Sequence, residues 1–165
     1  MAHESSPRPK KKHAWSDAGW KIWILFFFFD SRDIVHKEFA PPGQTVNHAF
    51  YKDVLERLRK RVQRVRTEIA DDLLLHHNKA PAHTALSIRQ FLAKENIPVL
   101  PHPPHSPELA PCDSTSSLSW NRIWRFIISG RWKTYKKIVT DELHTLTGNE
   151  FRYCYDQWEK RRTIL

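Results

Sequence analysis

The stretch that decides the fold is residues 20–39, WKIWILFFFFDSRDIVHKEF. Its first half, residues 20–29, is aromatic and β-branched, and Asp30 ends it. Residues 31–33 have turn composition, and residues 34–39 alternate roughly between apolar and polar side chains. Two such runs around a short polar turn predict a β-hairpin. The first strand is apolar on both faces, so we expect other parts of the protein to cover both of its sides.

A long amphipathic helix is predicted after Pro41, Pro42 and Gly43, which stop the second strand. Thr45 or Asn47 can cap its first turn. Apolar side chains recur at helical spacing in Tyr51, Val54, Leu55, Leu58, Val62, Val65 and Ile69. The opposite face is basic and either lies on a nucleic-acid backbone or is simply solvated. Its candidate DNA-binding residues are Arg57, Lys60, Arg61 and Arg64.

Strand and helix signals alternate in the next part of the chain. Residues 73–75 and 98–100 are short apolar runs typical of buried strands. Between them, a helix is predicted to begin at Pro81 and to end near Asn96. Strands joined by a helix run parallel. We therefore expect an α/β fold with a mixed sheet, made of the N-terminal hairpin and parallel strands, and flanked by helices.

The composition is that of one globular domain with an excess of positive charge. The chain has 165 residues, a formal net charge of +9 and a pI of about 9.8, which favours an anionic partner such as nucleic acid. No apolar run approaches the roughly 20 residues of a membrane span, and the first residues lack the apolar core of a secretory signal. Cys112 and Cys154 do not make a disulfide framework, which favours a reducing compartment.

Residues 1–19 have the composition of a basic, disordered tail. Prolines interrupt a cluster made of Arg8, Lys10, Lys11 and Lys12. This cluster is either a nuclear-import signal or a phosphate-contacting arm, or it is merely solvated. We include its four residues among the DNA-binding candidates, and we expect a nuclear location.

Three strand-end positions carry oxygen atoms that suit a divalent cation. Asp30 ends the first strand, and Asn78 follows the strand at residues 73–75. Asp113 follows a proline-rich run, and the 34 residues 79–112 separate it from Asn78. The predicted order of elements resembles ribonuclease-H-like folds, which hold two divalent cations between acidic side chains. Spacing alone is weak evidence in a chain with 18 acidic residues.

A histidine-rich zinc site is the competing interpretation. The residues concerned are His76, His77, His83, His102 and His105, with Cys112 nearby. Their spacings match no compact ligand pair, and the chain has no Cys-x-x-Cys motif. Nothing in the sequence marks an environment that would activate Cys112 as a nucleophile. The sequence therefore favours carboxylate chemistry over zinc or thiol chemistry.

Four segments resemble the mariner family of transposases. Residues 76–85, HHNKAPAHTA, are similar to the family's HHDNAPAHTA. Residues 97–113, IPVLPHPPHSPELAPCD, are similar to VLPHPPYSPDLAPCD. Residues 28–36, FFDSRDIVH, and 41–47, PPGQTVN, are similar to FFDSRGIVH and PPGQTVN. The resemblance covers about residues 5–113 and 138–160.

The resemblance implies a ribonuclease-H-like fold that cuts and rejoins DNA with a D,D,34-D carboxylate triad and magnesium or manganese. Asn78 falls on the second catalytic Asp, Lys79 on the Asn that follows it, and Asp113 on the third Asp. The family's first Asp lies on a central strand upstream of the FFDSRG strand. We expect this chain to lack that strand and the DNA-reading region before it. Asp30 then becomes a turn-starting residue.

Loss of catalysis is the expected consequence. Two divalent cations need negative oxygens, but Asn78 offers a neutral one and Lys79 adds positive charge beside it. Asp113 remains as the one metal-binding carboxylate, so we expect no useful strand cleavage and no tightly bound Mg²⁺ or Mn²⁺. Without the central strand, the hairpin and the strand at residues 73–77 either pair directly or leave an exposed, aggregation-prone edge.

Residues 114–121, STSSLSWN, replace a DFYLFP-like helix of the family. One inserted base can restore that pattern with suitable codons, so we hypothesise a frameshift that is compensated before about Ile138. The expected organisation is a basic tail (1–19), a partial catalytic domain (20–113), a degenerate segment (114–137) and C-terminal helices (138–165).

Three functional interpretations follow. The leading one is an inactive, mariner-derived remnant with non-specific DNA affinity. The second is an active metal-dependent transposase or endonuclease that uses Asp30, Asp113 and another acid such as Glu108. The third is a non-enzymatic protein that associates with full-length transposases or with a second copy of itself. None of them involves a membrane or a small-molecule substrate.

Overall fold

The computed structural model describes residues 24–41, 43–102 and 132–163. In chain order, the elements are β1 (Leu25–Phe29), β2 (Ile34–Phe39), α1 (His48–Val65), the 3₁₀ turn η1 (Thr67–Ile69), α2 (Pro81–Thr84), α3 (Leu86–Lys94), α5 (Trp132–Thr145) and α6 (Gly148–Thr163). No helix in these ranges is long and apolar enough to cross a membrane.

The predicted hairpin is confirmed. β1 and β2 pair antiparallel from Leu25 opposite Phe39 to Phe29 opposite Ile34. The register shifts between Phe28 and Phe29, so that Val35 is an extra residue on β2. The first strand begins at Leu25, whereas its predicted residues 20–23 lie outside the described part of the chain.

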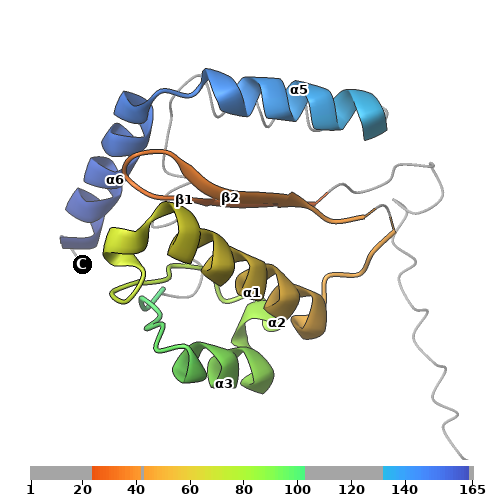
Figure 1. Cartoon of the computed structure of the whole chain (residues 1–165), viewed down its shortest axis with the longest axis vertical. Coiled ribbons are helices and arrows are strands. Elements are labelled where there is room, and N and C mark those ends of the chain that lie inside the picture. The colour runs from red at the N-terminus through yellow and green to blue at the C-terminus, as the bar shows by residue number, and fades with distance from the viewer. Residues whose placement is uncertain (1–23, 42, 103–131, 164–165) are drawn as a thin grey trace, which may run out of the picture.

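Protein covers the hairpin on both faces, as the apolar first strand predicts. Phe26 belongs to a core that α1 and α3 share, and Ile24 and Phe28 pack against it. Leu25, Phe27 and Phe29 pack instead against buried residues of α5 and α6. Figure 1 shows α1 below the hairpin, α5 above it and α6 across its turn end. Every side chain of β1 is therefore in contact with one of two helical layers.

Helix α1 follows the predicted apolar stripe for most of its length. The side chain of Asn47 caps the first turn by accepting a hydrogen bond from the backbone N–H of Phe50 at 2.9 Å. The helix ends at Val65, and the chain reaches Ile69 through η1 rather than as regular helix. Arg66 leaves helical geometry with φ −138°, and its side chain bonds to the hairpin turn.

The downstream strands and helix are shorter than predicted. Leu75 and Val99 form one isolated parallel bridge, which confirms the direction but not the length of the strands. Pro98 has no N–H to extend the ladder. The helix from Pro81 is broken at Ala85, whose φ of −57° and ψ of 148° separate α2 from α3. α3 then ends before Asn96, which has a positive φ of 53°.

The described residues do not form the single mixed sheet that the sequence predicts. β1 pairs with β2 in a two-stranded sheet, and the bridge between Leu75 and Val99 is separate from it. In the C-terminal part, α5 begins at Trp132, earlier than the predicted return of order at Ile138. Residues 1–23 and 103–131, with their predicted tail and degenerate segment, lie outside the described ranges.

Candidate active-site region at the Asn78 strand end

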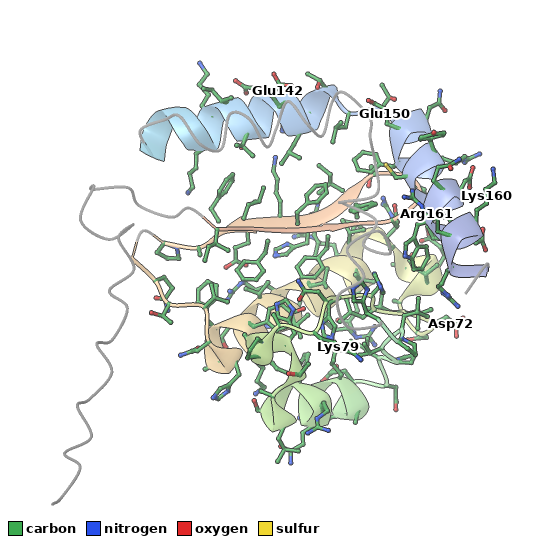
Figure 2. The ribbon with its side chains drawn as sticks, turned by 180° about the vertical axis from the view of Figure 1, so that it is seen from behind. Asp72, Lys79, Glu142, Glu150, Lys160 and Arg161 are labelled. Carbon is green, nitrogen blue, oxygen red and sulfur yellow. The ribbon has the colours of Figure 1, made fainter. Side chains whose placement is uncertain are left out.

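Asn78 lies in the loop that joins the parallel bridge at Leu75 to α2. Its side-chain oxygen accepts a hydrogen bond from the backbone N–H of Ala80 at 3.1 Å, which turns the chain into Pro81. Asn78 and Lys79 are both exposed. Figure 2 shows Lys79 on the α2 side of the hairpin, opposite Glu142 of α5. The position therefore presents a neutral amide beside an ammonium group.

A stacked aromatic cluster supports this loop from α1. The Tyr51 hydroxyl lies 2.9 Å from Nδ1 of His77, and the Tyr51 and His83 ring centroids are 3.9 Å apart. The rings of His77 and His83 stack at 5.3 Å. Burial lowers the pKa of His77 to about 4, with the charge of His83 acting in the same direction. At neutral pH these side chains form an uncharged packing unit that joins the loop to α1.

His76 points to a different part of the protein. Its Nε2 lies 3.1 Å from Nδ1 of His102, and its ring centroid lies 5.3 Å from that of Trp158 on α6. Burial lowers the pKa of His76 to about 4, assisted by the charges of His102 and Arg162. Successive histidines therefore serve two contacts, one with α6 and one with α1.

The described residues do not fit a metal centre. The histidines of the zinc hypothesis divide into two separate groups, His76 with His102 and His77 with His83. In the ranges that the structure describes, no group of three or more His, Cys, Asp or Glu side chains is placed to hold a metal ion. Asp113, the predicted metal ligand, and His105, Cys112 and Glu108 lie outside those ranges. The role of Asp113 therefore stays a prediction.

Asp30 serves the hairpin turn, as the resemblance implies. One carboxylate oxygen accepts hydrogen bonds from the backbone N–H groups of Arg32 and Asp33 at 2.8 and 3.0 Å. The other accepts from Nε of Arg66 at 2.7 Å. Burial raises the pKa of Asp30, but the hydrogen bonds from Arg66 and the turn amides outweigh it and hold that pKa below its usual value. Its oxygens are thus used inside the fold.

The basic residues of α1 divide into two sets. Arg57 donates two hydrogen bonds to the Glu38 carboxylate, at 2.8 and 2.7 Å, and Arg61 lies against the Val35 carbonyl oxygen. Lys60 and Arg64 are exposed. Of the DNA-binding candidates, Lys60 and Arg64 therefore remain open on the surface. Arg8, Lys10, Lys11 and Lys12 lie outside the described residues.

A groove between α1 and α3 is lined on the α1 side by the basic residues Lys52, Arg59 and Lys60. Lys94, in the last turn of α3, lines this groove together with Lys60. Sequence reasoning missed Lys94, because nothing in the local pattern places the end of α3 beside α1.

Comparisons with known proteins give one consistent result. The transposase family described as a partial DDE domain matches residues 3–71. The chain is 33% identical to the Mariner Mos1 transposase of Drosophila mauritiana over 174 residues, which cover 92% of this chain and 50% of that protein. It is 31% identical to the human histone-lysine N-methyltransferase SETMAR over 91 residues, or 53% of this chain and 13% of that protein.

Solved structures agree with the sequence comparisons. The catalytic domain of Mos1 matches with a TM-score of 0.74 at 28% identity, over 85% of this chain and 76% of that domain. A Mos1 paired-end complex with the left transposon end matches with a TM-score of 0.76 at 25% identity, over 98% and 47% of the two chains. The chain spans half the length of the curated Mos1 protein. The resemblance found in the motifs is confirmed: over most of its length this chain is similar in sequence to the Mariner Mos1 transposase, and it is similar in fold to the Mos1 catalytic domain.

Proposed function

We propose that this protein is a mariner-derived member of the DNA-transposition family that does not cut DNA and that binds DNA without sequence preference. The observation that carries the proposal is the exposed pair Asn78 and Lys79 at the strand end where the family motif has a catalytic Asp. A second proposed element is electrostatic affinity for DNA, which rests on the net charge of +9.

The chemistry of Asn78 argues against two-metal catalysis. Structures of the Mos1 catalytic domain have been solved with Mg and with Mn. Hard divalent cations need anionic oxygens to offset their charge. The Asn78 oxygen is neutral and already accepts from the Ala80 amide, and Lys79 adds a positive charge next to it. This strand end therefore repels a cation rather than attracting one.

Plasmid nicking in Mn²⁺ tests the loss of activity. We expect no nicking by the wild-type chain and no tight Mn²⁺ binding in calorimetry. The double variant Asn78→Asp/Lys79→Asn restores the family residues, and we expect it to bind Mn²⁺ more tightly than the wild type. Nicking by the wild type that disappears in Asp113→Ala would show an active enzyme and overturn the proposal.

DNA affinity is inferred from charge and from the relatives. Mos1 has been solved in a paired-end complex with a transposon end. In this chain the exposed Lys60 and Arg64 lie on the same helix, one turn apart, where they can contact successive phosphates. Phosphate contacts position a protein on DNA without reading its sequence. Binding should therefore be strong at low salt and indifferent to base order.

A salt titration with two duplexes tests this affinity. We expect equal affinity for a transposon-end duplex and a shuffled duplex, and a roughly hundredfold loss between 50 and 200 mM salt if about four phosphates are contacted. Lys60→Glu/Arg64→Glu should weaken binding at least tenfold. The control Arg152→Glu/Lys160→Glu on α6 changes the net charge equally and should have a smaller effect. A clear preference for the transposon end would contradict the proposal.

A nuclear location belongs to the same proposal, because a DNA ligand and the basic cluster at residues 8–12 both favour it. A fluorescent fusion should accumulate in the nucleus, and replacing Lys10, Lys11 and Lys12 by Ala should distribute it through the cell. Unchanged nuclear accumulation in that variant would show that the cluster is not the signal.

We also propose that this chain binds a second copy of itself, because Mos1 has been solved in paired-end complexes. Light scattering of the purified chain, alone and with a DNA duplex, tests it. A molar mass equal to that of one chain under both conditions would contradict self-association.

A further inference from the structure

A groove with a volume of about 540 Å³ runs along the outer edge of β2. Helix α1 forms one wall with Arg61 and Arg64. The end of α5 and the start of α6 form the other wall with Leu143, His144, Leu146 and Phe151. Leu143 and Phe151 are buried in the core, whereas His144 is exposed and its Nε2 lies 3.4 Å from Nζ of Lys37. The edge of β2 lies between a cationic wall and a wall that is apolar except for His144. This surface is different from the Asn78 loop and from the groove between α1 and α3.

The backbone of β2 presents hydrogen-bonding groups to this groove. The N–H of Ala40 donates to the carbonyl oxygen of Ile24 at 2.9 Å, which fixes the hydrogen-bonded pairs of the hairpin. Hydrogen-bonded pairs recur every second residue of an antiparallel ladder, so the backbone N–H and C=O groups of Glu38 and His36 also face β1. The N–H and C=O of Lys37, between them, therefore point away from β1. In the described part of the chain, no strand pairs with this outer edge of β2.

The two walls differ in what they would accept from an added strand. Successive side chains of a strand point to opposite faces. One set would meet Arg61 and Arg64, and the other set would meet Leu146 and His144, in the wall to which the buried Leu143 and Phe151 also belong. An added strand that satisfies both walls has acidic residues alternating with apolar ones.

We propose that this groove binds an extended partner peptide of alternating acidic and apolar residues, which adds to β2 as a third strand. Main-chain hydrogen bonds to the open edge would supply affinity, and the two walls would supply specificity. The proposal concerns a protein partner and does not depend on the proposed DNA affinity, although Arg64 belongs to both proposed surfaces.

Charge decides against two other occupants. A second copy pairing edge to edge through β2 would bring Lys37, Arg61 and Arg64 of both copies together, which costs like-charge repulsion. The segments of this chain outside the described residues, 1–23 and 103–131, each carry more Lys and Arg than Asp and Glu. Neither has a run in which acidic and apolar residues alternate. The occupant is therefore a separate, acidic polypeptide.

The test uses the full chain, labelled with ¹⁵N, and three capped peptides: EVEVEV, KVKVKV, and EVEVEV with N-methyl groups on alternate amides. We expect EVEVEV to bind at least tenfold more tightly than either control and to shift the Lys37 amide among the largest changes. Equal binding of the charge-reversed or N-methylated peptide would overturn strand addition.

Variants locate the site. Arg61→Glu/Arg64→Glu should weaken EVEVEV binding at least tenfold, whereas Arg152→Glu/Lys160→Glu should leave it within about twofold. Arg64→Glu alone keeps the Arg61 contact with the Val35 carbonyl and serves as the milder variant if the double variant is unstable. A DNA duplex that shifts the β2 amides while EVEVEV shifts none would assign the groove to nucleic acid and overturn the proposal.

Discussion

Asp30 and Asn78 occupy comparable places, because each follows a strand and each carries a side-chain oxygen bonded to a nearby backbone amide. They differ in whether a cationic side chain also binds the carboxylate or amide group. The Asp30 carboxylate also binds Arg66, whose side chain is 12% exposed, whereas Asn78 and its neighbour Lys79 are open to solvent. A strand-end oxygen therefore serves stability where a buried cation of the protein itself neutralises it. Where no cationic side chain neutralises the oxygen, the charge of the side chain that carries this oxygen decides whether a metal ion can bind.

The largest expected effect comes from removing the Asp30 carboxylate. Asp30→Ala leaves Nε of Arg66 and two turn amides without their acceptor, while Arg66 keeps its contact with Asp33. We therefore expect unfolding in urea to show a loss of about 2–4 kcal/mol. The control Asp72→Ala removes an exposed carboxylate and should cost less than about 0.5 kcal/mol. Equal effects would show that the network around Asp30 contributes nothing special.

As the pH falls, the histidines beside the Asn78 loop should reduce the stability of the protein before Asp30 does. His76 and His77 have pKa values of about 4 in the folded protein, against an ordinary 6.5. The unfolded chain then binds more protons between these values, so stability falls as the pH drops from about 6.5 to 4. We expect the melting temperature to fall by on the order of 5 °C across this window.

Variants and lower pH separate the two regions. His77→Gln should flatten part of the slope above pH 4. The contribution of Asp30, whose pKa is lowered, is present above its ordinary value and is lost only as the pH falls further. A melting temperature that is constant from pH 7 to 4 would contradict the neutral, buried state of both histidines.

A smaller effect is expected at the contact between α1 and the Asn78 loop. Tyr51→Phe keeps the ring stacked on His83 but removes the hydroxyl from His77, so we expect a loss of about 1 kcal/mol in urea unfolding. Tyr153→Phe alters an exposed tyrosine of α6 and should be neutral. A neutral Tyr51→Phe would mean that the loop is held by ring packing alone.

The smallest effect on stability is expected at Asn78 itself. Asn78→Asp keeps an oxygen that can accept from the Ala80 amide, and the site is exposed, so the unfolding free energy should change by less than about 0.5 kcal/mol. A large loss of stability would show that the amide nitrogen has a structural role and that the comparison with Asp30 is too simple.

Local pattern was sufficient for the elements that depend on neighbouring residues. The hairpin, the Asn47 cap and the apolar stripe of α1 follow from strand composition, turn residues and helical spacing. Local pattern did not predict where helices end when residues far apart in the sequence are in contact. α1 ends at Val65, where the next side chain, Arg66, bonds to Asp30 across the fold. The predicted helix from Pro81 is interrupted at Ala85, which packs against the core although alanine favours helix.

Only part of the candidate site could be predicted from the sequence. The motifs predict that Asn78 falls on the family's second catalytic Asp and Lys79 on the Asn that follows it. The sequence could not show that His76 turns to α6 while His77 turns to Tyr51. Nor could it show which of the α1 cations remain open. Arg57 is paired with Glu38 only because β2 lies beside α1 in space.

The sequence by itself determined the similarity to mariner transposases, the hairpin and the uncharged side chain at position 78, because these depend on residue identity and short-range order. Tertiary structure alone decided which charges are neutralised inside the protein and which edges stay open. Such properties depend on contacts between segments that are far apart along the chain. Burial and ion pairing change the chemistry of a side chain only after those segments have packed together.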